Sequence, residues 1–97
     1  MQFVITAYDG EGMLDRRLAV RGRHLEGMEK MKEHVICAGG LLDEDGNMKG
    51  SVLVMDFPDR SALDAYLAEE PYVQEHVWAK IDVEQMNVVI VNGEKRP

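Results

Sequence analysis

Residues 43–57, DEDGNMKGSVLVMDF, decide the fold. Asp45 and Gly46 form a dipeptide that favours a tight turn between antiparallel strands. The apolar run from Ser51 to Phe57 predicts a strand after the turn, and the apolar residues 35–42 predict its partner before the turn. The centre of the chain is therefore expected to be a β-hairpin.

Upstream of the hairpin, residues 13–20 and residues 21–34 each place apolar side chains at helical spacing. Gly22 lies where the two segments meet, and glycine weakens a helix interior by ~1 kcal/mol. We therefore expect one turn of helix followed by a separate second helix. Still further upstream, the β-branched and aromatic residues 2–8 predict a strand, which a loop over residues 9–12 follows.

Downstream of the hairpin, Asp59 or Ser61 can cap a helix over residues 60–69. Pro71 stops that helix, because the residue before a proline disfavours helical backbone. We expect a short irregular or helical connection over residues 72–79. Residues 80–91 then predict a long last strand, and residues 92–97 predict a loose polar tail.

The resulting order predicts one α+β domain over residues 1–97 with a ferredoxin-like βαββαβ plan. In this plan two helices pack on one face of a four-stranded antiparallel sheet. Val52–Met55 and Val88–Val91 are apolar at every position, however, so both faces of their strands are apolar. A second copy of the chain would cover the face that the helices leave open, which predicts a C2 homodimer.

The overall charge excludes some function classes. A net charge of -7 disfavours nucleic acid, which normally binds basic surfaces. The apolar runs are much shorter than the ~20 residues of a membrane-spanning helix, and no signal peptide is visible at Met1. A single cysteine, Cys37, fits a reducing compartment, so we expect a cytoplasmic protein.

Metal sites are not indicated by the residue spacings. His34 and Cys37 lie three apart, but no second pair is spaced to complete a four-ligand zinc site. Asp43, Asp45 and Asn47 imitate the start of a calcium loop that lacks its later glycine and glutamate. No phosphate-binding or nucleophile motif is present either, so neither a metal nor a cofactor is expected.

A basic cluster is the main functional signal in the residues themselves. Four arginines lie within eight positions, at Arg16, Arg17, Arg21 and Arg23. On a nearly continuous helix, Arg17, Arg21 and His24 would project to one side. This face can bind a small anion, or it can be a charged rim with its aliphatic stems packed and its heads in water.

The chain resembles the YciI-like proteins, a branch of the dimeric α-β barrel superfamily. The resemblance covers nearly the whole chain and is carried by Phe3-Val4-Ile5-x-Ala7-Tyr8-Asp9, Arg17-Leu18-Ala19-Val20-Arg21-x-x-His24-Leu25, Ala38-Gly39-Gly40, Gly50-Ser51, Glu70-Pro71-Tyr72-Val73 and Val77-Trp78. It implies a ferredoxin-like fold, a homodimer, and a site around His24 and the acid before Pro71-Tyr72. That acid is usually aspartate in the family and is Glu70 here, and a frequent family proline is replaced by Gly22.

What the resemblance implies for function is a small enzyme of the lyase, isomerase or dehalogenase type. Arg17 or Arg21 would hold a small anionic substrate, since a guanidinium matches a carboxylate. His24 would move a proton and Glu70 would orient it, with Glu69 as a competing acid. Hydrogen bonds could come from Ser51 and Tyr72. The alternative is a non-catalytic module of the same fold that binds a ligand or only dimerises.

Overall fold

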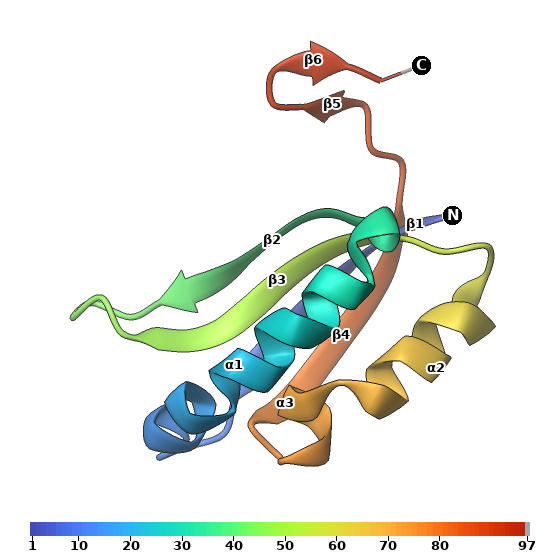
Figure 1. Ribbon diagram of the computed structural model, residues 1–97. Coiled ribbons are helices and arrows are strands. Elements are labelled where there is room, and N and C mark those ends of the chain that lie inside the picture. Colours follow the sequence, from blue (N-terminus) through green and yellow to red (C-terminus); the bar gives the residue numbers. More distant parts are fainter. Residues whose placement is uncertain (97) are drawn as a thin grey trace.

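The computed structural model describes residues 1–96, and its main body is a four-stranded sheet with helices on one face (Figure 1). The strands of this sheet are β1 (Gln2–Asp9), β2 (Val35–Leu42), β3 (Met48–Asp56) and β4 (Trp78–Met86). The helices are α1 (Leu14–Lys30), α2 (Arg60–Glu69) and α3 (Pro71–Gln74), with a 3-10 turn over Lys32–His34. This order confirms the ferredoxin-like βαββαβ prediction.

The strands lie in the order β2–β3–β1–β4, and every neighbouring pair is antiparallel. The β2–β3 hairpin is present, and β3 begins three residues earlier than the sequence predicts. Asp43 shapes its turn, because its carboxylate accepts hydrogen bonds from the backbone N–H groups of Asp45 and Asn47. Gly46 supplies the positive φ of 83° that this turn needs.

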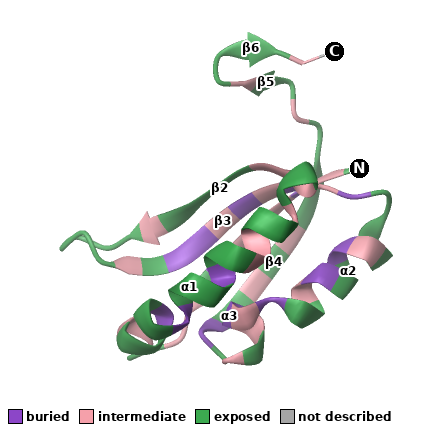
Figure 2. Cartoon of the chain, in the orientation of Figure 1, coloured by how far each residue is buried: buried purple, intermediate pink, exposed green. Residues whose placement is uncertain are grey.

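Alternation along the strands separates two faces of the sheet. Phe3, Ile5 and Ala7 of β1 are buried beneath the helices with Leu53 and Met55 of β3. Figure 2 shows buried residues on β3 and also on α1 and α2, which cover this face. The intervening residues belong to the opposite face, which no helix among residues 1–96 covers. At its centre lie the half-buried Val4, Val52 and Val54.

Helix α1 runs without a break through Gly22, so the prediction of two separate helices was wrong. Arg17, Val20 and His24 are buried on one side of this helix, and their contacts bridge the glycine. A weak helix former costs only ~1 kcal/mol, which packing of both flanking turns readily offsets. The continuous helix is what keeps the site residues on one face.

The last strand is shorter than predicted, because β4 ends at Met86. Its partner β1 begins at Gln2, opposite Met86, so the chain beyond has no strand to pair with. Residues 90–95 instead form a small separate hairpin of β5 (Ile90–Val91) and β6 (Glu94–Lys95). The predicted loose tail over residues 92–97 contains the second strand of this hairpin, and Pro97 lies outside the described residues.

Asn92 and Gly93 explain this second hairpin. Both have positive φ, of 52° and 78°, as a two-residue hairpin turn requires. Figure 1 shows the hairpin standing apart from the main sheet. Val88–Val91 therefore does not belong to that sheet. Of the two apolar segments that predicted a dimer, only Val52–Met55 in β3 lies in the sheet and still supports that prediction.

A β-bulge opens strand β4. Tyr8 pairs with Lys80 and Asp9 pairs with Trp78, so Ala79 is an extra residue opposite a single step of β1. The bulge turns Trp78 onto the helix-covered face, where it is buried.

Glu70 joins α2 to α3. Its backbone is extended, with φ -66° and ψ 122°, as expected for a residue before proline. Its side chain accepts a hydrogen bond from the backbone N–H of Tyr72 at 3.2 Å and so caps α3. At the other end of α2, Asp59 accepts a hydrogen bond from the Ala62 backbone N–H and is the predicted N-cap.

Candidate functional site

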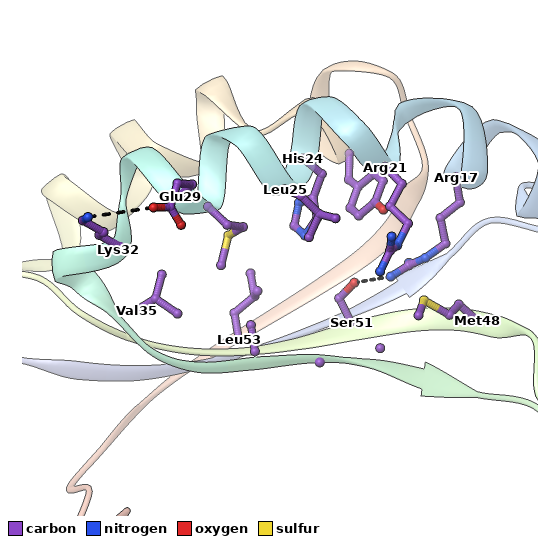
Figure 3. A pocket seen from close by; sticks show the side chains of 15 residues that line it. Arg17, Arg21, His24, Leu25, Glu29, Lys32, Val35, Met48, Ser51 and Leu53 are labelled. Atoms are coloured by element: carbon purple, nitrogen blue, oxygen red, sulfur yellow. Dashed lines mark hydrogen bonds and ion pairs between the residues drawn. The ribbon is translucent and has the colours of Figure 1, made fainter.

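A cavity of about 630 Å³ lies between helix α1 and strands β2 and β3 (Figure 3). Five of the six site residues that the sequence indicates line it: Arg17, Arg21, His24, Ser51 and Tyr72. The sixth, Glu70, is buried beside His24. Apolar side chains, including Leu25, Met28, Val35 and Leu53, form much of the remaining wall. An apolar hollow with a few convergent polar groups is typical of small-molecule sites.

The polar end of the cavity is built mainly by one helix face. Arg17, Arg21 and His24 follow each other on α1 at intervals of four and three residues, so they share a face. Figure 3 shows the two arginine side chains converging near Ser51 of β3, with His24 next along the helix. The continuity of α1 through Gly22 is therefore essential to this arrangement.

His24 and Glu70 form a buried hydrogen-bonded pair. His24 Nδ1 lies 2.6 Å from Glu70 Oε1, and the two side chains are 10% and 0% exposed. A carboxylate at Nδ1 fixes the orientation of the ring and leaves Nε2 for a ligand. Glu69, the competing acid, is exposed and makes no hydrogen bond to His24.

The Tyr72 ring packs against both His24 and Arg17. Its ring stacks on the His24 ring at 4.2 Å with an interplanar angle of 19°, and the Arg17 guanidinium lies 4.7 Å from its centroid. Burial raises the pKa of Tyr72, although the positive charges of Arg17 and Arg21 oppose this. The hydroxyl is therefore a protonated hydrogen-bond donor at neutral pH.

Arg17 is fixed by the protein itself. It donates hydrogen bonds to Asp9 Oδ1 at 2.8 Å and to Ser51 Oγ at 2.7 Å, and it is 3% exposed. Burial raises the pKa of Asp9, and the adjacent Arg17 charge partly offsets this. Because Asp9 already compensates its charge, Arg17 is better suited to shape the site than to capture an anion.

Arg21 is the freer cation. It lines the cavity, is exposed, and makes no ion pair with any residue between 1 and 96. Arg16 and Arg23 lie elsewhere: Arg16 donates to the Glu75 carbonyl, and Arg23 pairs with the Glu75 carboxylate at 2.9 Å. Of the four clustered arginines, only Arg17 and Arg21 line this cavity.

Three residues near the site were not singled out from the sequence. Asp9 was assigned to a loop, which was wrong, because it is the last residue of β1, where it forms an ion pair with Arg17. The ring centroids of Trp78 and Tyr72 lie 5.5 Å apart because the bulge in β4 turns Trp78 toward the helices, and no sequence pattern predicts this bulge. Tyr66 donates a hydrogen bond to Glu70 Oε2 at 2.5 Å. Its spacing of four from Glu70 was a usable signal.

The described residues contain neither a metal-ligand cluster nor a membrane-spanning helix. Among residues 1–96, no three His, Cys, Asp or Glu side chains gather as metal ligands would. His34 Nδ1 lies 2.8 Å from the Asp56 carbonyl and its ring stacks on Phe57, while Cys37 is exposed. No helix of this part of the chain is long and apolar enough to cross a membrane.

Comparison with known proteins places this chain in a family. A family model described as the YCII-related domain matches residues 1–87. The chain belongs to the YCII-related family. An uncharacterized protein of Haemophilus influenzae is 30% identical, over 92% of this chain and 99% of that protein. Protein YciI of Escherichia coli O6:H1 is 28% identical over the same shares of the two chains.

A solved structure of an enzyme has the same fold as this YCII-family chain. It is 5-chloro-2-hydroxyhydroquinone dehydrochlorinase (TftG) from Burkholderia phenoliruptrix AC1100, in complex with 2,5-dihydroxybenzoquinone. The TM-score is 0.84 at 25% identity, and the match covers 90% of this chain and 94% of the enzyme.

Proposed function

We propose that this YCII-family protein is a cofactor-independent enzyme of the lyase, isomerase or dehalogenase type that moves a proton on a small anionic substrate. The observation that carries the proposal is the buried His24–Glu70 pair at the wall of an open cavity that also holds Arg21. A histidine oriented by a carboxylate is suited to general acid–base catalysis. Its action in the cytoplasm as a homodimer belongs to the same proposal.

Each polar group has one task in this mechanism. Arg21 binds the substrate anion by charge-assisted hydrogen bonds, and Arg17, held by Asp9, supports Ser51 and Tyr72 as hydrogen-bonding groups. His24 Nε2 takes a proton from an O–H or C–H group of the substrate. Glu70 stabilises the imidazolium that forms.

The dehydrochlorinase suggests the substrate class. That protein is named for a chlorinated hydroxyhydroquinone and was solved with a dihydroxyquinone, both flat rings with acidic hydroxyl groups. In the keto tautomer of such a ring, the carbon that bears chlorine also carries a hydrogen. From this tautomer His24 would take a hydroxyl proton while the C–Cl bond breaks and chloride leaves with the bonding electrons. The products are a hydroxyquinone, chloride and the proton held by His24, so no oxidant or reductant is needed.

The test measures binding and turnover separately. We expect 2,5-dihydroxybenzoquinone to raise the melting temperature, because a ligand of the native state stabilises it. Arg21→Ala should weaken this binding roughly tenfold, and added salt should weaken it further. Arg23→Ala is the matched control, since Arg23 pairs with Glu75 away from this cavity.

Turnover is followed as chloride release from 5-chloro-2-hydroxyhydroquinone, and muconolactones are tested for isomerisation. His24→Asn should lower kcat by about 100-fold or more if His24 is the general base. Binding of the quinone without turnover of any of these compounds would instead support the non-catalytic ligand-binding module. Failure to bind any acidic ring compound or small carboxylate would contradict the proposal as a whole.

A further inference from the structure

Tyr66 lies directly behind the His24–Glu70 pair and continues it into helix α2. Its hydroxyl donates to Glu70 Oε2 at 2.5 Å, while Glu70 Oε1 lies 2.6 Å from His24 Nδ1. Tyr66 and Glu70 are four residues apart at the end of α2, so their side chains meet. We propose that Tyr66 is a positioning residue of this site, which holds the Glu70 carboxylate in the place and ionisation state that His24 requires.

The hydrogen bonds of Glu70 show why a third group is needed. Oε1 faces His24 and also accepts the Tyr72 backbone N–H at 3.2 Å, and Oε2 accepts the Tyr66 hydroxyl. The side chain is fully buried, and a buried carboxylate is costly unless donors surround it. Tyr66 is the donor for Oε2, so without its hydroxyl this oxygen would lose its partner.

The Tyr66 hydroxyl is a dependable donor. Burial raises its pKa, and the negative charge of Glu70 raises it further, so it stays protonated throughout the physiological range. The same oxygen lies 3.2 Å from Met28 Sδ. A hydroxyl carries a single proton, and a carboxylate is a much stronger acceptor than a thioether. The proton therefore belongs to the bond with Glu70.

Among residues 1–96, other charged side chains near His24, Glu70 and Tyr66 make no ion pair with Glu70. On the far side of α1, a second cavity of about 390 Å³ is lined by Tyr66 and Glu70 together with Arg23, Glu26, Lys30 and Glu69. These four charged side chains are exposed, so water and salt screen their effect. On the near side, Arg17 and Asp9 act across the Tyr72 ring.

A role of Tyr66 in catalysis rests on the proposed function of His24. The effect of Tyr66 on the His24–Glu70 pair, however, can be tested on the free protein. The experiment follows the His24 ring by NMR over a pH titration of wild type and Tyr66→Phe. Removing a donor to the Glu70 anion raises the proton affinity of the His24–Glu70 pair. We expect the titration midpoint to move upward by roughly half a pH unit.

Two controls separate this effect from a general loss of structure. Tyr66→Phe keeps the ring that packs near Phe57, and Met28→Leu removes only the sulfur contact of the hydroxyl. Met28→Leu and the distant Tyr8→Phe should leave the His24 midpoint unchanged. In the wild type, the Tyr66 hydroxyl proton should give a slowly exchanging NMR signal even if Tyr66→Phe does not fold.

An unchanged or lowered His24 midpoint in Tyr66→Phe would overturn the inference, and so would rapid exchange of the wild-type Tyr66 hydroxyl proton. The acid limb of the kcat–pH profile should move with the midpoint in the same variant. If the midpoint moves but the profile does not follow, Tyr66 still positions the pair, and it is the proposed role of His24 that fails.

Discussion

Glu70 performs three tasks with one side chain and one backbone. Its extended backbone ends α2, its carboxylate caps α3, and the same carboxylate orients His24. The glutamate side chain contacts His24, Tyr66 and the Tyr72 backbone at once.

The first residue-scale prediction concerns this pair. Glu70→Gln removes the negative charge that favours a protonated ring, so the NMR titration midpoint of His24 should move to lower pH, by roughly one unit. The midpoints of His34 and His76 should stay nearly unmoved. Glu69→Gln is the matched control, because Glu69 is adjacent and exposed. An unmoved His24 midpoint in Glu70→Gln, or a larger effect from Glu69→Gln, would contradict this reading.

A second prediction concerns the buried Arg17–Asp9 ion pair. Arg17→Met leaves the Asp9 carboxylate without its cation, which should cost about 3 kcal/mol of unfolding free energy at pH 7. The pKa of folded Asp9 is raised by burial, so its protonated form is favoured in the native state. Stability from this group is therefore present below the unfolded pKa and is lost as pH rises through the folded pKa.

The loss in Arg17→Met should accordingly be smaller at pH 4 than at pH 7. Urea unfolding at the two pH values measures it, and Arg21→Met serves as the control because Arg21 is exposed. Equal losses from Arg17→Met at both pH values would show that Asp9 does not sense the missing charge.

Part of the candidate site was predictable at the scale of residues, for a physical reason. Arg17, Arg21 and His24 follow the helical repeat. Glu70, Ser51 and Tyr72 became candidates only through the family resemblance. Asp9 and Trp78 were not predictable, because their positions depend on a long-range ion pair and on a bulge. The different roles of Arg17 and Arg21 could be assigned only from the structure, because the sequence does not show that Asp9 neutralises Arg17 and not Arg21.

At the scale of elements, helix α1 carries the polar end of the site although two glycines weaken it. Gly22 and Gly27 both lie in this helix, and a Cβ added at either one would meet no atom within 4 Å. Neither glycine is therefore required by packing within the described residues. Tertiary contacts of the buried face maintain the helix across them.

Gly22→Ala should therefore raise the unfolding free energy by about 0.5–1 kcal/mol, as alanine favours helical backbone. Thermal or urea unfolding measures the gain. Gly50→Ala is the contrasting variant, because its Cβ would come within 2.5 Å of the Ala7 backbone oxygen. That variant should lose stability, and a destabilised Gly22→Ala would mean that α1 is strained at this point.

The ends of elements were harder to predict than their existence. The Asp45-Gly46 turn was recognised, whereas the equivalent signal at Asn92-Gly93 was read as part of a loose tail. Apolar character alone extended the last strand to residue 91, although a strand also needs a partner. Register against β1 decides where β4 stops, and register is not visible in a single strand.

At the scale of the whole molecule, the sheet has one covered face and one open face. Val4, Val52 and Val54 are central to the open face, while Asp82 and Glu84 of β4 lie beside them at its edge. An apolar centre with a polar edge is typical of a protein–protein interface. A second copy of the chain remains the predicted partner.

Light scattering at micromolar concentration should therefore give twice the 11.0 kDa chain mass. Val54→Lys places a charge at the centre of the open face and should yield a folded monomer. Leu53→Lys, one residue earlier, places it in the core and should unfold the chain. A wild type that is monomeric and stable, or a Val54→Lys variant that stays dimeric, would contradict the predicted interface.

The extra residue at Ala79 has a consequence for how this chain can change in length. If Ala79 were deleted, β4 could pair with β1 in regular alternation, and no residue type of the site would be altered. Trp78 would then stay opposite Asp9, on the helix-covered face and beside the ring of Tyr72, because the bulge already absorbs the extra position. The aromatic wall behind His24 thus depends on the bulge only because the chain carries one residue more than regular pairing needs. Deletion of Ala79 should therefore be tolerated better than insertion of a further residue at this point.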